Sequence, residues 1–139
     1  MPNNKVVLIT GGSRGIGAQT AKLFAEHGYA VCINYRQDVN AARDVEQYIH
    51  DLGGNCILVQ GDIAKEEDVV RLFRETRQKL GPISVMVNNA AILHQQGKIT
   101  ELTTARIVKT FNVNVTGSFL CCIEAVKHMA YSYQGDGGA

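Results

Sequence analysis

Proline is scarce in this sequence, with 2 prolines among 139 residues, whereas glycine occurs 14 times. Hydrophobic residues make up 45% of the chain and charged residues 19%. This balance is typical of a soluble globular protein, and the glycine content favours an α/β architecture. A chain of this length fits one domain and buries roughly two-thirds of its unfolded surface.

The sequence also has no marked excess of positive or negative charge, because the formal net charge is +1 and no lysine or arginine run occurs. A nucleic-acid partner is therefore not expected. No segment approaches the ~18 consecutive apolar residues of a membrane span. The N-terminal residues also lack the apolar stretch and small-residue cleavage site of a secretory signal peptide. We therefore expect no membrane partner.

CxxC spacing is absent among the 4 cysteines, which are Cys32, Cys56, Cys121 and Cys122. The adjacent pair Cys121-Cys122 suits neither a disulfide nor zinc coordination. We expect no metal site, and the pattern predicts buried, reduced thiols in a cytoplasmic protein.

Short apolar runs alternate with amphipathic stretches along the first two-thirds of the chain. We expect strands at residues 6–9, 30–34, 56–60 and 84–88, and helices at residues 15–27, 40–52 and 65–80. The apolar runs are continuous, which is typical of parallel strands that helices cover on both faces. The repeated strand–helix units therefore predict a Rossmann-type, doubly wound α/β parallel sheet.

The last part of the chain is predicted to form one long helix over residues 103–132. Apolar residues recur there at steps of three or four, at Ile107, Phe111, Val115, Phe119, Ile123, Val126 and Ala130. A helix that is apolar over so wide an arc packs against the core or against another subunit. Residues 134–139 are glycine-rich and resemble a loop leading into another element. We expect the chain to be a fragment, truncated before a fifth strand.

Between the first strand and the first helix lies a glycine-rich turn, Thr10-Gly11-Gly12-Ser13-Arg14-Gly15-Ile16-Gly17. Glycines at such a place let the backbone turn tightly and let a pyrophosphate approach, while the helix N-terminus presents N–H groups to the phosphates. The turn therefore predicts a dinucleotide site. A simple tight turn is the alternative.

The second strand ends without the acidic residue that holds the ribose 2′-hydroxyl in NAD-preferring proteins. Asn34, Tyr35 and Arg36 occupy this place, and the nearest acid is Asp38. A guanidinium at Arg36 suits a 2′-phosphate, and Arg14 in the glycine turn supplies a second positive group. We expect NADP(H), with NAD(H) as the less favoured cofactor, unless both arginines are merely solvated.

Three further motifs follow in order. Asp62-Ile63 comes after the third expected strand, Asn88-Asn89-Ala90-Ala91 closes the fourth, and Asn114-Val115-Thr116-Gly117 lies in the long helix. Residues 112–117 are also poor helix formers, which predicts a local irregularity. With the glycine turn, these motifs resemble the short-chain dehydrogenase/reductase family.

The resemblance implies that residues 1–139 form a single NAD(P)-binding Rossmann domain. It implies a cofactor site of Gly11, Ser13, Arg14, Gly15, Ile16, Gly17, Tyr35, Arg36, Asp62, Ile63, Asn89, Ala90 and Ala91. It also implies hydride transfer between nicotinamide and a small carbonyl or alcohol substrate. Asn114 would hold a water of the proton relay through its main-chain carbonyl. The long helix would pack against a partner subunit, commonly within a homotetramer.

The chain departs from the family pattern in two ways. Ala91 replaces the usual glycine, and no tyrosine is followed four residues later by lysine, so the family's acid/base pair is missing. We expect the 139-residue chain alone to be inactive. The alternative is a non-catalytic module that senses NADP(H) or serves as a scaffold.

Overall fold

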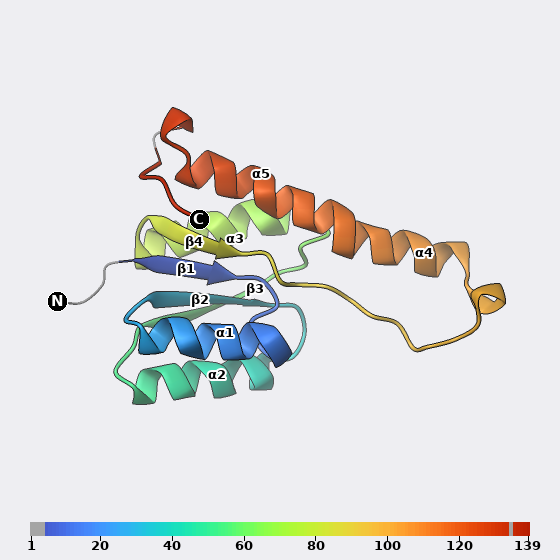
Figure 1. The fold of residues 1–139 in the computed structure, drawn as a ribbon, viewed down its shortest axis with the longest axis horizontal. Coiled ribbons are helices and arrows are strands. Elements are labelled where there is room, and N and C mark those ends of the chain that lie inside the picture. Colours follow the sequence, from blue (N-terminus) through green and yellow to red (C-terminus); the bar gives the residue numbers. More distant parts are fainter. Residues whose placement is uncertain (1–4, 134) are drawn as a thin grey trace.

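Four parallel strands form one sheet, in the order β3-β2-β1-β4, in the computed structural model, which describes residues 5–133 and 135–139 (Figure 1). The strands are β1 (Val6–Ile9), β2 (Ala30–Tyr35), β3 (Cys56–Gln60) and β4 (Ile83–Val87). Because β1 lies between β2 and β4, the strand order reverses there, as in a doubly wound sheet. The predicted fold class is confirmed.

Helices cover both faces of this sheet (Figure 1). Helices α1 (Gly15–Glu26) and α2 (Val39–Asp51) lie on one face, and α3 (Glu66–Leu80) and α5 (Ser118–Met129) lie on the other. In β1, Val7 and Ile9 pack toward α1 and α2, while Leu8 packs toward α3. Successive side chains of a strand point to opposite faces, so a strand buried on both sides must be apolar throughout.

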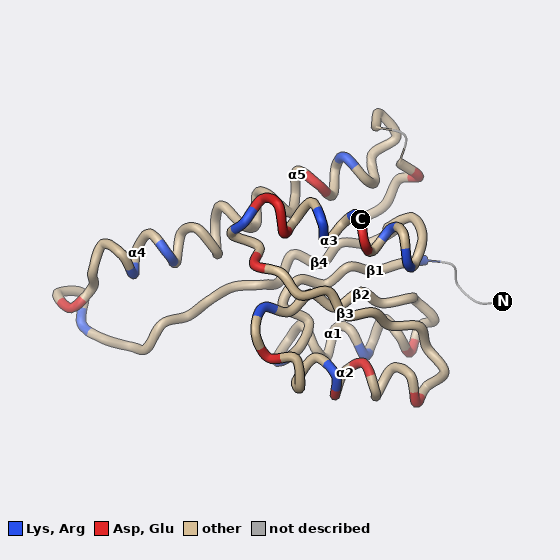
Figure 2. The backbone as a smooth tube through the Cα atoms, turned by 180° about the vertical axis from the view of Figure 1, so that it is seen from behind, with Lys and Arg blue, Asp and Glu red and all other residues tan. Residues whose placement is uncertain are grey.

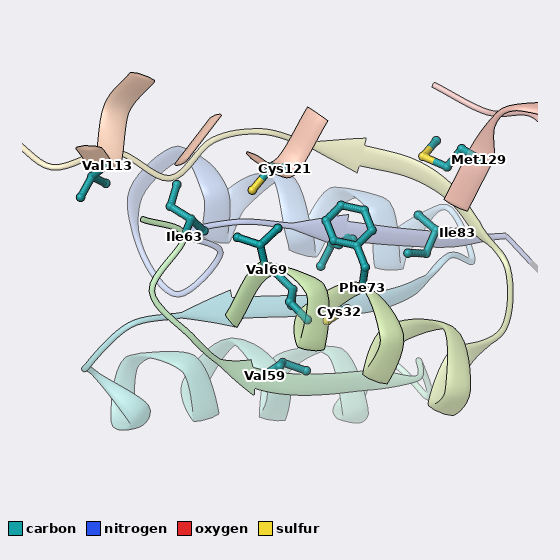
Figure 3. Close-up of a cluster of buried hydrophobic side chains, with 11 residues drawn as sticks. Cys32, Val59, Ile63, Val69, Phe73, Ile83, Val113, Cys121 and Met129 are labelled. Carbon is teal, nitrogen blue, oxygen red and sulfur yellow. The ribbon is translucent and has the colours of Figure 1, made fainter. Parts of the chain in front are cut away.

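The core between the sheet, α3 and α5 is built around Phe73, which is fully buried (Figure 3). Cys32 from β2, Ile83 from β4 and Met129 from α5 belong to the same cluster. Cys32, Cys56 and Cys121 are buried, and burial raises the pKa of each of these thiols to about 12. The expectation of a buried thiol is wrong for Cys122, which is exposed because its side of α5 faces outward.

The long helix is continuous from Thr104 to Met129 but consists of three parts. They are α4 (Thr104–Phe111), a π-helical turn η2 (Asn112–Gly117) and α5. A short 3-10 turn, η1 (Ile99–Glu101), precedes them, and both η1 and α4 project from the body of the domain (Figure 1). The irregularity expected at residues 112–117 is confirmed.

The predicted end of this helix at residue 132 is wrong. Ala130 has extended backbone with ψ 140°, and Tyr131–Tyr133 forms a separate 3-10 turn, η3. Glycines following the helix bind its last carbonyls: Gly135 N donates to Ala130 O at 3.0 Å and Gly137 N donates to Met129 O at 2.7 Å. These bonds replace the helical ones and end α5. Gln134 of the expected loop lies outside the described residues.

The free edge of β4 is met by Ala139. Its N–H donates to Ser84 O at 2.9 Å, and its carbonyl accepts from Met86 N at 2.8 Å. The two bonds have the pattern of a parallel pairing with β4. Among the described residues, no helix combines the length and the apolar character needed to cross a membrane.

Leu72→Ala is predicted to lower the free energy of unfolding by about 2–5 kcal/mol, because Leu72 is 1% exposed and its loss leaves a cavity under the sheet. Leu23→Ala removes the same atoms from α1, where the side chain is 55% exposed, and is expected to cost less than about 1 kcal/mol. Urea unfolding measures both variants. Equal losses would contradict the assigned core.

Candidate functional site

A cavity of about 410 Å³ opens at the carboxyl ends of the strands. Its lining residues are Gly11, Ser13, Arg14, Asn34, Tyr35, Arg36, Gln37, Asp38, Gly61, Asp62, Ile63, Asn89, Ala90, Ala91, Ile92 and Val113. Except for Val113 from η2, these residues lie in the last positions of the strands or in the segments that follow them. They surround the point where the strand order reverses, which is where open α/β sheets bind ligands.

Most residues of the expected cofactor site meet in this cavity. Gly15, Ile16 and Gly17 do not line it. Gly15 and Ile16 are exposed in the first turn of α1, with Ile16 80% exposed, whereas Gly17 is buried beneath the glycine turn. The tertiary structure also adds Asn34, Gln37, Asp38, Gly61, Ile92 and Val113, which the motifs did not include.

The glycine turn brings the start of α1 against the end of β1. Gly11 has φ +63°, a conformation that favours glycine, and a Cβ added at Gly17 would lie 2.3 Å from the Gly11 carbonyl oxygen. Arg14 occupies the N-cap position of α1, but its side chain forms no capping hydrogen bond. The first turn of α1 contains no acidic residue. The N–H groups in the first turn of α1 and the positive end of the helix dipole therefore remain available to an anion.

Buried Thr10 ties the glycine turn to the residues that follow β4. Its Oγ1 accepts from Asn89 N at 3.0 Å and from Ala90 N at 3.1 Å. In return, Asn89 Nδ2 donates to the carbonyls of Thr10 and Gly11 at 3.0 and 3.1 Å. These bonds hold the two sides of the cavity together, and they give the Asn-Asn-Ala-Ala motif a structural role.

Asn34 performs a similar function across β1, β2 and β3. Its side chain is 2% exposed, accepts from Gly11 N at 3.4 Å, and donates to Val59 O and Gly61 O at 3.3 and 3.1 Å. Thr10 and Asn34 were not among the predicted site residues. A signal for Asn34 was present, because an amide at the end of a buried apolar strand needs hydrogen-bond partners.

The charged side of the cavity lies at the end of β2. Arg14 Nη2 and Asp38 Oδ2 form an exposed ion pair at 3.3 Å, and Asp38 Oδ1 caps α2 by accepting from Ala41 N at 2.9 Å. The Arg36 side chain is exposed and forms no hydrogen bond or ion pair within the described part of the chain. Its backbone carbonyl accepts from Gln60 Nε2 at 3.0 Å.

The Asp62-Ile63 motif and the Asn-x-x-Gly element meet each other in space. Asp62 Oδ1 accepts from Ala64 N at 3.0 Å, which folds its side chain into a tight turn. Ile63 is 4% exposed and packs under Gly117, where an added Cβ would lie 2.9 Å from it. Glycine at position 117 therefore lets the π-helical turn approach the residues that follow β3.

Asn114 fastens the segment after β4 to the π-helical turn. Its Oδ1 accepts from Ile92 N at 2.8 Å, and its Nδ2 donates to Ile92 O at 2.9 Å. Its main-chain carbonyl accepts from Ser118 Oγ at 3.0 Å. Ala91, which precedes Ile92, is exposed on the cavity wall.

Residues 5–139 match the family model described as short chain dehydrogenase. The chain belongs to the short-chain dehydrogenase family. It is 47% identical over 134 residues to the uncharacterised oxidoreductase YgfF of Escherichia coli (strain K12), covering 96% of this chain and 54% of that protein. It is 31% identical over 128 residues to elsinochrome reductase 1 of Elsinoe fawcettii, covering 92% and 48%.

Solved structures of the family agree with the fold. A short chain dehydrogenase from Burkholderia cenocepacia in complex with NADP superposes with a TM-score of 0.86 at 35% identity, covering 91% of this chain and 51% of that one. A mutant short-chain dehydrogenase/reductase from Serratia marcescens gives 0.86 at 31% identity, covering 92% and 52%. The chain thus spans about half the length of the family members it matches.

Gly17→Ala is predicted to destabilise this family member by roughly 1–3 kcal/mol, because the new methyl group would overlap the Gly11 carbonyl and Asn89 Nδ2. Gly61→Ala is the control, since a Cβ there meets Asp68 Cβ at an ordinary 3.4 Å. Urea unfolding compares the two variants. A Gly17→Ala chain as stable as the Gly61→Ala chain would contradict the close approach of α1.

Proposed function

We propose that this chain forms the NADP(H)-binding part of an oxidoreductase that transfers a hydride between nicotinamide and a carbonyl or alcohol carbon. The main support is the cavity at the switch point of the sheet, which joins a glycine turn, an uncapped helix N-terminus and two arginines. The NADP bound to the Burkholderia cenocepacia relative supports the same cofactor class.

The residues present fit a dinucleotide. The turn over residues 11–17 and the first N–H groups of α1 would receive the pyrophosphate, because neither a side-chain cap nor an acidic residue competes there. Asp62 and Ile63, on the far side of β2, would flank the adenine ring. Asn89, Ala90 and Ala91 would lie along the ribose on the nicotinamide side.

The preference for NADP(H) rests on Arg36 and Arg14. Both line the cavity at the end of β2, and the Arg36 guanidinium has no internal partner among the described residues. A 2′-phosphate would supply that partner through two parallel, charge-assisted hydrogen bonds. Asp38 is held by the N-terminus of α2 and by Arg14, which leaves it less free to accept from a ribose hydroxyl.

The bound nicotinamide would supply or accept the hydride. Asn114 is the residue of this chain that we assign to the proton relay, where its main-chain carbonyl, which also accepts from Ser118 Oγ, would hold a water. None of the 5 tyrosines is followed four residues later by lysine. A phenol with a pKa of about 10 needs a neighbouring cation to exchange protons near neutral pH. The 139-residue chain alone is therefore proposed to bind cofactor without turnover.

Arg36→Ala is predicted to weaken NADPH binding by about 10- to 100-fold, the loss expected for a bidentate bond to a phosphate, and to leave NADH binding unchanged. Titration of the 139-residue chain by fluorescence measures both affinities. Arg74→Ala, on the exposed side of α3, is the control for the loss of a positive charge.

Absence of NADPH binding by the unaltered chain would refute the proposed function. Equal losses for NADPH and NADH in the Arg36→Ala chain would refute only the assignment of the 2′-phosphate. The same samples, mixed with simple aldehydes and ketones, are expected to oxidise no NADPH. Turnover would show that the acid/base pair is not needed.

We also propose that the chain associates with copies of itself through the long helix. Large apolar residues lie exposed along one arc of α4, η2 and α5, with Phe111 60%, Phe119 68% and Val126 52% exposed. Apolar patches of this extent usually mark an interface. A reducing, cytoplasmic compartment is proposed in addition, since the four cysteines are all free.

Phe119→Glu is predicted to convert the associated chain to a monomer, because a carboxylate would be desolvated at the centre of the apolar arc. Analytical ultracentrifugation measures the mass of the unaltered and variant chains. Leu23→Glu, at a 55% exposed position on α1, is the control and should leave association unchanged. An unaltered chain that sediments as a monomer would exclude this interface.

A further inference from the structure

Two charged residues of α3 bind the backbone at the end of β3. Asp68 Oδ2 accepts from Asp62 N at 2.8 Å, and Arg71 Nη2 donates to Gln60 O at 2.7 Å. Asp68 and Arg71 also bind each other at 3.3 Å. The backbone on both sides of Gly61 is therefore fixed by side chains from the helix that follows it.

The guanidinium of Arg71 is itself held in place. Glu75, one turn further along α3, binds Arg71 at 3.3 Å and Lys79 at 3.2 Å. This helix carries both acidic and basic residues (Figure 2), with three acids in its first turn and two bases in its last. Ion pairs between residues three or four apart stabilise an exposed helix only weakly. Helix stability alone therefore does not account for the two bonds from Asp68 and Arg71 to the turn.

The turn held by Asp68 and Arg71 belongs to the adenosine end of the cavity. Gly61, Asp62 and Ile63 line the 410 Å³ cavity. Gln60 extends the connection to β2, because its Nε2 donates to the carbonyl of Arg36 at 3.0 Å. Asp68 and Arg71 thus fix the backbone of the residues proposed to flank the adenine ring. The exposed side chain of Gln60 connects this backbone to Arg36, the residue proposed to face the 2′-phosphate.

The charge on Asp68 belongs to this arrangement. The hydrogen bond from the Asp62 N–H lowers the pKa of Asp68 below its ordinary value, despite some desolvation by burial, and Arg71 lowers it further. The carboxylate is therefore ionised near neutral pH. Charge-assisted bonds of this kind are stronger and geometrically stricter than neutral ones.

We propose that Asp68 and Arg71 are positioning residues for the adenosine 2′-phosphate end of the cofactor. This assignment rests on the proposed function. It means that the two residues order the turn before the cofactor binds, so that binding does not have to supply the free energy of ordering it. Neither residue lines the 410 Å³ cavity, but both line a neighbouring hollow of about 390 Å³ that also reaches Arg36. We assign their effect on binding to the bonds that they form with the backbone of Gln60 and Asp62.

The test is the affinity of the 139-residue chain for NADPH and for adenosine 2′,5′-bisphosphate, which lacks the nicotinamide half. Asp68→Asn is expected to weaken both by about tenfold, the fold-change that corresponds to one charge-assisted hydrogen bond. Equal losses for the two ligands are expected, because the nicotinamide half does not contact the turn. Arg71→Lys, which keeps the charge but not the forked geometry, is expected to weaken both ligands as well.

Glu67→Gln is the matched control. Glu67 is the exposed neighbour of Asp68 in the first turn of α3, and its variant loses the same charge without touching the turn. All affinities are measured well below the unfolding temperature of each variant. A purely structural role would lower that temperature and leave the affinities unchanged, which would overturn the inference.

A second variant covers the case in which Asp68→Asn does not fold. Gln60→Ala removes only the bond from an exposed side chain to the Arg36 carbonyl, and it is expected to weaken adenosine 2′,5′-bisphosphate several-fold. Unchanged binding by this variant also overturns the inference. An unaltered chain that binds neither ligand refutes the proposed function and this inference together, whereas unaltered binding with insensitive variants refutes the inference alone.

Discussion

Helix α1 approaches the end of β1 so closely that no side-chain atom fits at Gly17, and the rest of the site depends on this contact. An added Cβ would lie 2.3 Å from the Gly11 carbonyl and 2.6 Å from Asn89 Nδ2. The approach aims the N-terminus of α1 across the carboxyl end of the sheet, where an anion can meet its free N–H groups. It also brings the glycine turn within reach of the segment that follows β4.

Three buried or half-buried polar side chains then fix the strand ends relative to one another. Thr10 and Asn89 join β1 to β4, and Asn34 joins β1 and β2 to β3. Each of these groups is satisfied by backbone partners, as a polar atom shielded from water requires. The cavity is therefore bounded by backbone held in place before any ligand arrives, and α3 contributes the same kind of restraint through Asp68 and Arg71.

The elements were predictable because their signals are local. Continuous apolar runs marked all four strands, and the glycines marked the turns, so the predicted bounds of the four strands and of α1, α2 and α3 differ from the observed ones by one residue at most. The end of α5 was missed because Gly135 and Gly137 fold back onto its last carbonyls. The π-helical turn was expected only as an irregularity. It packs through Gly117 against Ile63, and these two residues are distant in sequence.

By itself, the sequence determined the parallel sheet and the glycine turn, because each depends on spacing within a short segment. Most of the other cavity-lining residues were expected only because the motifs resemble the family. Tertiary structure decided which polar groups meet. It placed Thr10 against Asn89, Asp68 against the Asp62 N–H, and Ile16 outside the cavity. Such contacts join residues from separate strands and helices, and the distance between two side chains is set by how the elements pack, which no local pattern encodes.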